Sequence, residues 1–193
     1  IAQSMFQQMA RERFPVPSWI VVGAGTGGTS ATIGRFVRYQ RHATQLCVAD
    51  PEGSVFVDYH RTGDASLTGP GSQIEGIGRP RVEASFIRTL VDRMLTVSNV
   101  DSVAAMQVLT ELLGRKVGPS TGTNLVGMLT LACEMRKSGQ QGSILSLLCD
   151  AGERYLGSCF WAAWVPEHKV NCAPARHRIK QQLVFQPSAM QRR

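Results

Sequence analysis

A glycine-rich turn between a strand and a helix constrains this chain more than any other feature. Residues 19–22 are four consecutive apolar residues, which predict a buried strand, and residues 30–40 have a helical pattern. The loop between them, residues 23–29, has the sequence Gly-Ala-Gly-Thr-Gly-Gly-Thr. Glycine lets the backbone approach a ligand closely, and the amides and dipole of a helix N-terminus favour an anion. The turn therefore predicts a phosphate site, with the hydroxyls of Thr26 and Thr29 as further donors.

Two kinds of phosphate ligand fit this loop. Residues 23–28 match the G-x-G-x-x-G dinucleotide pattern, and Asp50 follows a second apolar segment, residues 45–49, where an acid could bind a ribose 2′-hydroxyl. Alternatively, residues 25–29, Gly-Thr-Gly-Gly-Thr, form a cup for a single phosphate group. A tight turn without a ligand is the third possibility. The loop by itself leaves these interpretations open.

Length and composition indicate one well-buried domain. The chain has 193 residues, of which 43% are hydrophobic, and it contains no apolar run of 18 residues that could span a membrane. It begins without methionine or a signal pattern, as though within a longer sequence. The five cysteines are scattered without zinc-site spacing, so we expect no metal and buried thiols in a reducing cytoplasm. They are Cys47, Cys133, Cys149, Cys159 and Cys172.

The net charge of +7 is concentrated near the C-terminus. Residues 166–193 contain six Lys or Arg residues and one acidic residue, which accounts for five of the seven net charges. The preceding sequence has no basic stripe interleaved with aromatic residues, so we expect no nucleic-acid partner. We therefore predict a domain at residues 1–165 and a basic, disordered tail at residues 166–193. Trp161 and Trp164 are expected to pack against the domain from one helix face.

Strands and helices alternate along the chain with short connections. Besides the segments named above, we expect helices at residues 4–13, 83–94 and 102–113, the last capped by Asp101, a further helix ending near Lys137, and strands at residues 115–117 and 143–149. Residues 51–82 are rich in Gly, Pro, Ser and Asp and are expected to form a long, ordered excursion. This repetition predicts an α/β fold with three layers, in which helices cover both faces of a mostly parallel sheet.

Three further segments are expected at the edge of the sheet that carries the glycine-rich turn. Residues 118–123, Gly-Pro-Ser-Thr-Gly-Thr, follow a predicted strand, and residues 150–155 follow the last one. Between the glycine-rich turn and residues 118–123, residues 74–78 form a glycine-spaced loop, Ile-Glu-Gly-Ile-Gly, that could lie close to a flat ligand. Because ligands of open α/β sheets gather at the carboxyl ends of the strands, we expect these segments to share one pocket.

The order of these motifs resembles the C-terminal half of the pyridoxal-phosphate-dependent cysteine synthase family (fold type II). Gly-Thr-Gly-Gly-Thr, Glu-Gly-Ile-Gly, Val-Gly-Pro-Ser-Thr-Gly-Thr and Gly-Glu-Arg-Tyr-Leu follow one another between residues 25 and 156. Residues 1–9, Arg79-Pro-Arg and Leu148-Cys-Asp are similar, more specifically, to the bacterial L-cysteine desulfhydrase branch. The resemblance extends to about Val165 and implies the large-domain part of the tryptophan synthase β-like fold. It also implies that the phosphate belongs to pyridoxal 5′-phosphate, with the dinucleotide match incidental.

The resemblance implies a role for each motif. Ser120 would place its hydroxyl against the pyridine nitrogen, while Gly76, Ile77 and Gly78 would form the wall on the substrate side. The residues implied to surround the cofactor phosphate are Gly25, Thr26, Gly27, Gly28 and Thr29. Residues 150–155 would close the pocket near the ring edge. A neutral hydroxyl cannot hold the ring nitrogen protonated as a carboxylate would, which favours loss of a β-substituent over a long-lived carbanion.

The implied reaction is β-elimination or β-replacement through an aminoacrylate, with cysteine or O-acetylserine as substrate. The full-length enzyme would be cytoplasmic and homodimeric. The Schiff-base lysine belongs to the family's N-terminal half, and none of Lys116, Lys137, Lys169 and Lys180 matches its position. The catalytic residue is therefore unassigned, and we expect an inactive fragment. A nicotinamide-dinucleotide oxidoreductase domain and a non-catalytic interaction module remain as alternatives, and cysteine synthesis is not separated from desulfhydration.

Overall fold

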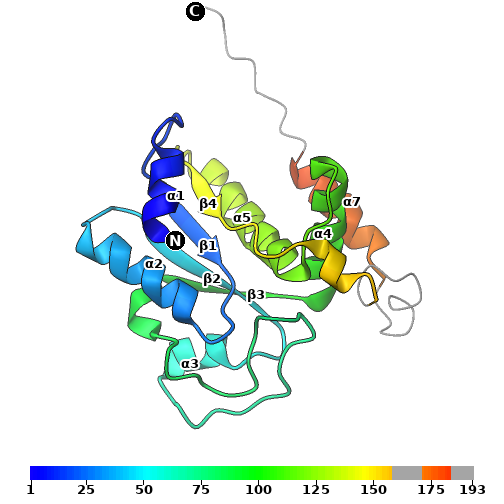
Figure 1. Cartoon of the computed structure of the whole chain (residues 1–193), viewed down its shortest axis with the longest axis horizontal. Helices are drawn as coiled ribbons and strands as arrows, with labels where there is room; N and C mark the ends of the chain where they lie inside the picture. Colours follow the sequence, from blue (N-terminus) through cyan, green and yellow to red (C-terminus); the bar gives the residue numbers. More distant parts are fainter. Residues whose placement is uncertain (158–170, 184–193) are drawn as a thin grey trace, which may run out of the picture.

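A four-stranded parallel sheet in the order β3-β2-β1-β4 lies at the centre of the protein (Figure 1). The computed structural model describes residues 1–157 and 171–183. The strands are β1 (Trp19–Val22), β2 (Gln45–Pro51), β3 (Arg93–Val97) and β4 (Ile144–Ser146). All three strand pairs are parallel, so the connections after the strands leave the sheet at one shared edge.

Helices cover both faces of this sheet. Ile20 and Val22 of β1 are buried on the face covered by α1 (Ala2–Met9) and α2 (Gly28–Tyr39), whereas Val21 is buried on the opposite face. The opposite face is covered by α5 (Pro119–Lys137), which contacts all four strands. Strands that are buried on both faces have continuous apolar sequences, which is why residues 19–22 show no alternation of apolar and polar residues. The expected α/β fold with a parallel sheet between helical layers is confirmed.

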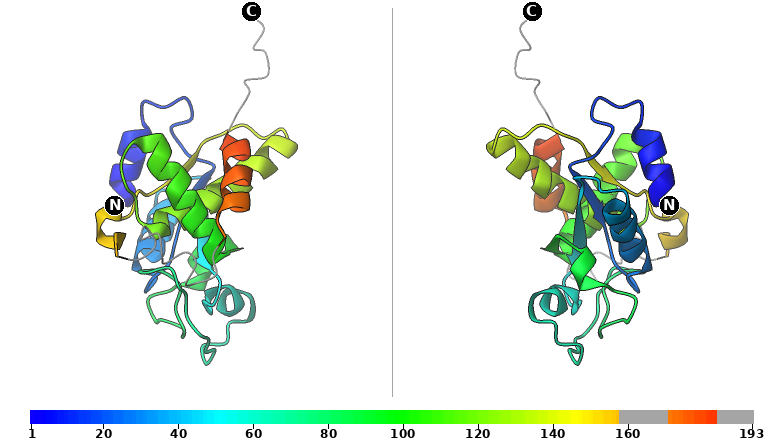
Figure 2. Two further views of the ribbon diagram at one scale, coloured as in Figure 1. Left: turned by 90° about the vertical axis from the view of Figure 1, so that its right-hand side faces the viewer. Right: turned by 90° about the vertical axis from the view of Figure 1, so that its left-hand side faces the viewer.

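Two further helices pack on the outside of α5, as Figure 2 shows. They are α4 (Asn99–Leu113) and α7 (Ala173–Leu183). The Oγ of Ser98 accepts a hydrogen bond of 3.0 Å from the amide of Asp101, so Ser98 caps α4. Asp101, expected as the cap, lies instead in the first turn. A Ser at the N-cap with an acid in the first turn satisfies the free amides and the helix dipole together.

The expected helix at residues 83–94 is wrong. The chain forms a short 3₁₀ turn, η1 (Arg88–Leu90), and then enters strand β3, which pairs with β2 from Cys47 to Pro51. The carboxylate of Asp92 joins the two segments, because its Oδ2 accepts a hydrogen bond of 2.7 Å from the amide of Leu46. Residues 83–92 are turns and a short 3₁₀ segment, and only residues 93–97 pair with β2, a pairing that spacing alone cannot reveal.

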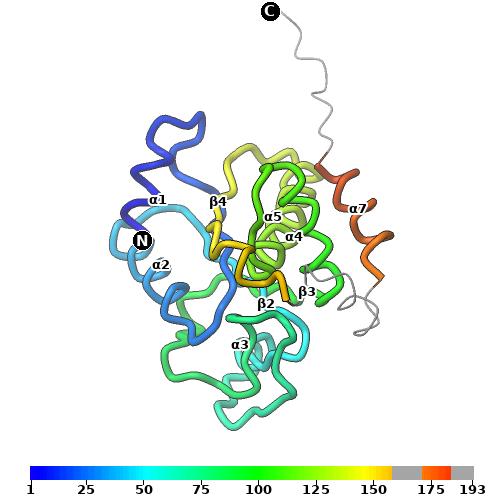
Figure 3. Tube along the Cα trace, turned by 45° about the vertical axis from the view of Figure 1, so that its right-hand side comes forward, coloured from blue at the N-terminus to red at the C-terminus, as the bar shows by residue number. Residues whose placement is uncertain are grey.

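The segments between β2 and β3 lie below the carboxyl edge of the sheet (Figure 3). The excursion contains one helix, α3 (Phe56–Thr62), and its later part approaches the loop after β1, where the amide of Gly78 donates to the carbonyl of Ala24 over 2.8 Å. Residues 115–117, expected as a strand, form only an isolated antiparallel bridge between Val117 and Ala151. The bridge holds two loops together at the same edge.

Part of the expected disordered tail is a helix. In α7, Ala175 and Ile179 are buried together with Cys172 against α4, and Leu183 continues the same face. The spacing 172, 175, 179, 183 is helical, so the apolar periodicity of this helix is present in the sequence beside the basic residues. Trp161, Trp164 and the rest of the predicted tail lie outside the described residues. None of the described helices combines the length and apolarity that a membrane span requires.

Candidate functional site

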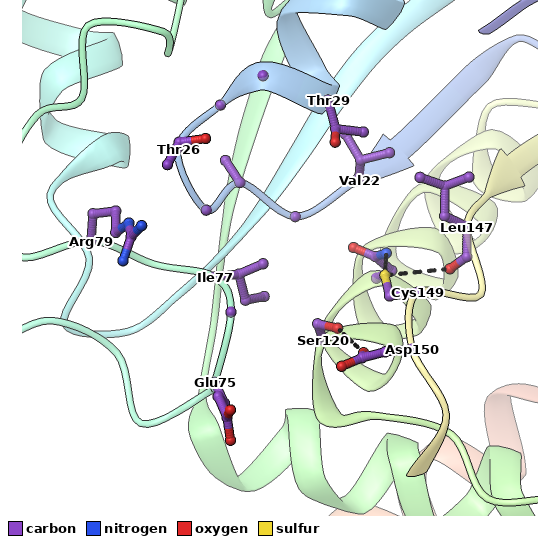
Figure 4. Close-up of a pocket in the computed structure, with 17 residues that line it drawn as sticks. Val22, Thr26, Thr29, Glu75, Ile77, Arg79, Ser120, Leu147, Cys149 and Asp150 are labelled. Atoms are coloured by element: carbon purple, nitrogen blue, oxygen red, sulfur yellow. Dashed lines mark hydrogen bonds between the residues drawn. The ribbon is translucent and has the colours of Figure 1, made fainter. Parts of the chain in front are cut away.

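A cavity of about 660 Å³ opens at the carboxyl edge of the sheet (Figure 4). Four segments line it: the loop after β1, the excursion around Gly76, the first turns of α5 and the segment after β4. Every residue predicted to bind the cofactor or wall the substrate lies on this cavity except Gly78. A volume of this size falls within the usual range for small-molecule sites. The fold thus brings together motifs that are far apart in the sequence: almost 100 residues separate Gly25 from Ser120.

The loop after β1 forms a cup of backbone amides at the start of α2. Gly27 is the N-cap of α2 and has φ 90°, a left-handed conformation that residues with a side chain rarely adopt. A Cβ on Gly25 would overlap the carbonyl oxygen of Gly76, so the cup needs glycine there to let the second loop approach. The first amides of a helix have no partner within the helix, and the first turn of α2 contains no acidic residue. The cup is therefore suited to an anion.

Threonine hydroxyls extend this cup. Thr26 and Thr29 both line the cavity, and Figure 4 shows their side chains on its wall. The neighbouring hydroxyls are used within the helix, since Ser30 donates to the carbonyl of Gly27 over 2.9 Å and Thr32 donates to that of Gly28 over 2.8 Å. Thr26 and Thr29 are thus the hydroxyl residues of this loop that line the cavity.

The glycine-spaced loop forms one wall of the cavity. Ile77 presents its side chain beside Gly23, close enough that a Cβ on that glycine would lie 3.0 Å from it. Gly78 does not line the cavity, but its hydrogen bond to Ala24 ties this wall to the cup. An apolar side chain held at this place supplies a surface on which a flat ring can lie. Gly78 therefore supports the wall without forming it.

Ser120 faces the cup from the far side of the cavity, in the first turn of α5 (Figure 4). It is 6% exposed, and its Oγ donates a hydrogen bond of 3.4 Å to Oδ1 of Asp150. The hydroxyl of Tyr155 donates to Oδ2 of the same carboxylate. Residues 150–155 were expected near the ring edge, and the structure adds that the carboxylate of Asp150 lies beside Ser120 and lines the same cavity.

The cavity is also lined by residues that were not selected from the sequence as ligands, among them Glu75, Arg79, Asn124 and Cys149. Asn124 is 1% exposed, and its Nδ2 lies 3.5 Å from the Sγ of Cys149. Its Oδ1 has no hydrogen-bond partner among the described residues, so this buried acceptor is available to a donor on a ligand. Asn124 lies four residues after Ser120 on α5, so helical spacing was the signal that could have found it. Cys149 is exposed, contrary to the expectation of buried thiols, whereas Cys47 and Cys172 are buried.

Asp50 does not occupy the position that the dinucleotide interpretation requires. It is 1% exposed within β2, and its Oδ2 accepts a hydrogen bond of 3.2 Å from the amide of Val57. Burial raises the pKa of this carboxyl to about 7, although hydrogen bonds from Ser54 and Val57 act in the opposite direction. A carboxylate sealed between β2 and α3 cannot reach a ribose beside the cup. The role proposed for Asp50 is therefore wrong.

The two ends of the cavity differ in chemistry. Amides and hydroxyls at the cup suit a phosphate, while Ser120 and Asp150 offer one hydroxyl and one carboxylate at the opposite end. The side chains between them include Ile77 and Leu147. A phosphorylated, flat heteroaromatic ring with a polar ring atom fits this donor set, and pyridoxal 5′-phosphate has these features. None of the lysines in the described ranges lines the cavity.

Comparison with known proteins gives a family match and several relatives. The family model described as "Pyridoxal-phosphate dependent enzyme" matches residues 1–150. L-cysteine desulfhydrase Cds1 of Mycobacterium tuberculosis is 55% identical over 166 residues, which cover 86% of this chain and 45% of that protein. Cysteine synthase A of Escherichia coli (strain K12) is 28% identical over 144 residues, which cover 74% of this chain and 44% of that protein.

The fold is also found in a solved structure. The crystal structure of O-ureido-L-serine synthase superimposes with a TM-score of 0.62 at 24% identity, over 80% of this chain and 45% of the other. The chain therefore spans less than half the length of these relatives. The match over residues 1–150 confirms the resemblance noted in the sequence, and with it the enzyme class and the cofactor of the family. The chain belongs to the family of pyridoxal-phosphate dependent enzymes.

Proposed function

We propose that this chain forms the cofactor-phosphate part of an enzyme of cysteine metabolism, of the L-cysteine desulfhydrase or cysteine synthase type. The relatives named above act in this chemistry according to their names, and the 55% identity to the desulfhydrase favours that branch. The single observation that carries the proposal is the cavity, in which the cup and Ser120 face one another. The substrates proposed are cysteine and O-acetylserine.

Each residue set has a separate task in this proposal. Gly25, Gly27 and Gly28 bring backbone amides to the phosphate, and the hydroxyls of Thr26 and Thr29 add hydrogen bonds. Gly76 and Ile77 hold the ring from one side and exclude water from the substrate side. Ser120 binds the ring nitrogen through its Oγ. When bound, the cofactor withdraws electrons from the substrate and so allows a β-substituent to leave.

The unpartnered Oδ1 of Asn124 supports a polar ligand in the same cavity. A buried acceptor without a partner costs about 1–3 kcal/mol, which a donor on a bound ligand would recover. Asn124 is therefore proposed as a further ligand-binding residue beside Ser120. The group that transfers the substrate proton in the whole enzyme is not assigned to any residue of this chain.

The proposal is tested with the full-length protein that contains this chain, reconstituted with pyridoxal phosphate. We expect sulfide release from L-cysteine in one assay, or formation of cysteine from O-acetylserine and sulfide in the other. The ratio of the two rates decides between the desulfhydrase and the synthase. A protein that binds the cofactor but catalyses neither reaction would contradict the assignment to cysteine metabolism.

We further propose that the full-length enzyme is a cytoplasmic homodimer. The free thiols of Cys47, Cys133, Cys149 and Cys172 support a reducing compartment, because such thiols persist where disulfides are kept reduced. Light scattering of the full-length protein would test the dimer, with a monomeric mass as the contradicting result.

A further inference from the structure

We propose that Cys149 is a covalent capture site for amino-acid disulfides such as cystine, which react with its thiol when the cavity holds no cofactor. The captured half of the disulfide then occupies space in the cavity that the cofactor needs. Competition with pyridoxal phosphate is the part that rests on the function proposed above, in which Cys149 has no role.

Cys149 is the most accessible of the cysteines in the described ranges. It is exposed and lines the cavity, whereas Cys133 is half-buried and does not line it, and Cys47 and Cys172 are buried. Burial also raises the pKa of the Cys47 thiol to about 12, so this thiol does not supply a reactive thiolate at neutral pH. A small disulfide that enters the cavity therefore meets the thiol of Cys149.

Hydrogen bonds hold the thiol in place on the cavity wall. Figure 4 shows the sulfur of Cys149 on the wall that also carries Ser120 and Asp150. The amide of Cys149 donates to Oγ1 of Thr121 over 3.1 Å, and its Sγ donates to the carbonyl of Leu147 over 3.8 Å. The segment after β4 is thus tied to α5 at the position of the sulfur.

Asn124 of α5 offers a polar partner for a ligand beside this thiol. Its Nδ2 donates to the Sγ of Cys149 over 3.5 Å, while its buried Oδ1 has no partner among the described residues. A buried acceptor without a partner is unfavourable, and the ammonium group of an amino acid is a donor that can satisfy it. An amino acid held at Cys149 therefore gains a hydrogen bond that the free cavity lacks.

The charges on the cavity match an amino acid, which carries both a carboxylate and an ammonium group. The amides of the cup suit a carboxylate, and so does Arg79, the one basic residue that lines the cavity in the described part of the chain. Glu75 and Asp150 line the same cavity and suit ammonium groups. A disulfide of two amino acids offers these groups on each half, and cystine, the oxidised form of the proposed substrate, belongs to this class.

The reaction is a thiol–disulfide exchange. The thiolate of Cys149 attacks one sulfur of cystine, so that a new S–S bond forms while the original S–S bond breaks. The other half leaves as a thiolate and takes up the proton that Cys149 lost. Cys149 is oxidised and the departing cysteine is reduced, so the exchange needs no further oxidant. Free cysteine reverses it by the same chemistry and regenerates the thiol.

The test follows Cys149 by mass spectrometry in the full-length wild-type protein, freed of cofactor and treated with cystine. Tryptic digestion places Cys149 and Cys133 in separate peptides, residues 138–154 and 117–136, each with a single cysteine. We expect one cysteinyl group on the peptide of Cys149 and none on that of Cys133, which is the internal control. Cystamine, which lacks carboxylates, should react about tenfold more slowly, as expected for the loss of one charge-assisted hydrogen bond.

Competition with the cofactor is measured on the same protein. Bound pyridoxal phosphate should protect Cys149 from cystine, and treatment with cystine should lower the affinity for pyridoxal phosphate until a thiol reductant restores it. In Cys149→Ser, cystine treatment should leave the cofactor affinity of the variant unchanged. Cys133→Ser is the matched control and should respond to cystine as the wild type does.

The outcomes separate the capture site from the proposed function. A cofactor-free wild type without an adduct at Cys149, or with equal labelling of Cys133, would overturn the capture site. Equal labelling of Cys149 with and without bound cofactor would overturn the competition. A protein that is labelled at Cys149 but binds no pyridoxal phosphate would overturn the proposed function and support the capture site.

Discussion

Thr29 and Thr32 lie one helical turn apart on α2, but only Thr29 lines the cavity. Thr29→Val removes a donor to the phosphate and nearly preserves side-chain volume. Losing a hydrogen bond to a charged group costs about 1.5–3 kcal/mol, so we expect affinity for pyridoxal phosphate to fall about ten- to a hundredfold in the full-length protein. Fluorescence titration with the cofactor measures this change.

Thr32→Val is the matched control for this substitution. The hydroxyl of Thr32 donates to the carbonyl of Gly28 and is exposed, so its removal should leave cofactor affinity close to the wild-type value. Equal affinities of the two variants would show that the Thr29 hydroxyl does not bind the phosphate.

Asp50 makes the stability of the fold depend on pH. Its pKa rises from 3.8 to about 7 on folding, because the buried carboxyl is desolvated. Between these values the folded state binds the proton more tightly than the unfolded state, so this contribution to stability is full below pH 4 and is lost as the pH rises toward 7. The loss is at most about 1.4 kcal/mol per pH unit.

Asp50→Asn should remove this dependence, because an amide does not ionise and can still accept from Val57. Urea unfolding of the full-length wild type and of the variant, at pH values from 4.5 to 7 about one unit apart, gives the free energy of unfolding at each pH. The slope of this free energy against pH is then compared between the two proteins. Identical slopes in the wild type and the variant would show that Asp50 keeps an ordinary pKa in the folded protein.

Among the elements, α7 packs on α4 through both apolar and charged contacts, which contribute differently to stability. Ile179 is 2% exposed against α4, while Arg178 pairs with Asp101 and Lys180 pairs with Glu111 at the half-exposed rim. Because solvent screens the rim pairs, Arg178→Gln should cost less than about 1 kcal/mol. Ile179→Ala should cost about 2–5 kcal/mol, since it leaves a cavity in the contact.

Hydrogen exchange of the α7 amides in the 193-residue chain resolves these two contributions. We expect Ile179→Ala to lose protection throughout the helix and Arg178→Gln to retain most of it. A larger loss in Arg178→Gln would mean that charge, and not apolar burial, holds α7 on α4.

For the whole molecule, the positions of the lysines limit most strongly what this chain can catalyse alone. Lys116 and Lys137 do not line the cavity, and Lys180 pairs with Glu111 over 2.7 Å. Abstraction of a substrate proton needs a base within hydrogen-bond reach, which in this family is the Schiff-base lysine. The 193-residue chain alone should therefore release no sulfide from cysteine.

Borohydride reduction in the presence of pyridoxal phosphate, followed by peptide mass spectrometry, tests the same limit. We expect no stoichiometric cofactor label on any lysine of the chain, whereas the full-length protein serves as the positive control. A fully labelled Lys116 or Lys169 would contradict this prediction and identify a different attachment residue.

The sequence by itself determined the architecture and most of the site. Apolar runs at β1 and β2, followed by turns and helices, were sufficient for a parallel sheet between helices, because their signals are local. The glycines and threonines of the cup and the position of Ser120 were also visible, since each motif lies in one continuous segment. The roles assigned to them remain predictions until the cofactor-binding variants are measured.

Tertiary structure alone decided the features that depend on pairing between distant segments. The sequence carries no local signal for strand β3, because residues 93–97 become a strand only through their pairing with β2. The burial of Asp50 likewise depends on α3, which the position of Asp50 after an apolar run does not reveal. The carboxylate of Asp150 reaches Ser120, 30 positions earlier, through the bridge at Val117. Such contacts are made in space between residues with no local signal for each other, so only the fold can bring the carboxylate of Asp150 beside Ser120.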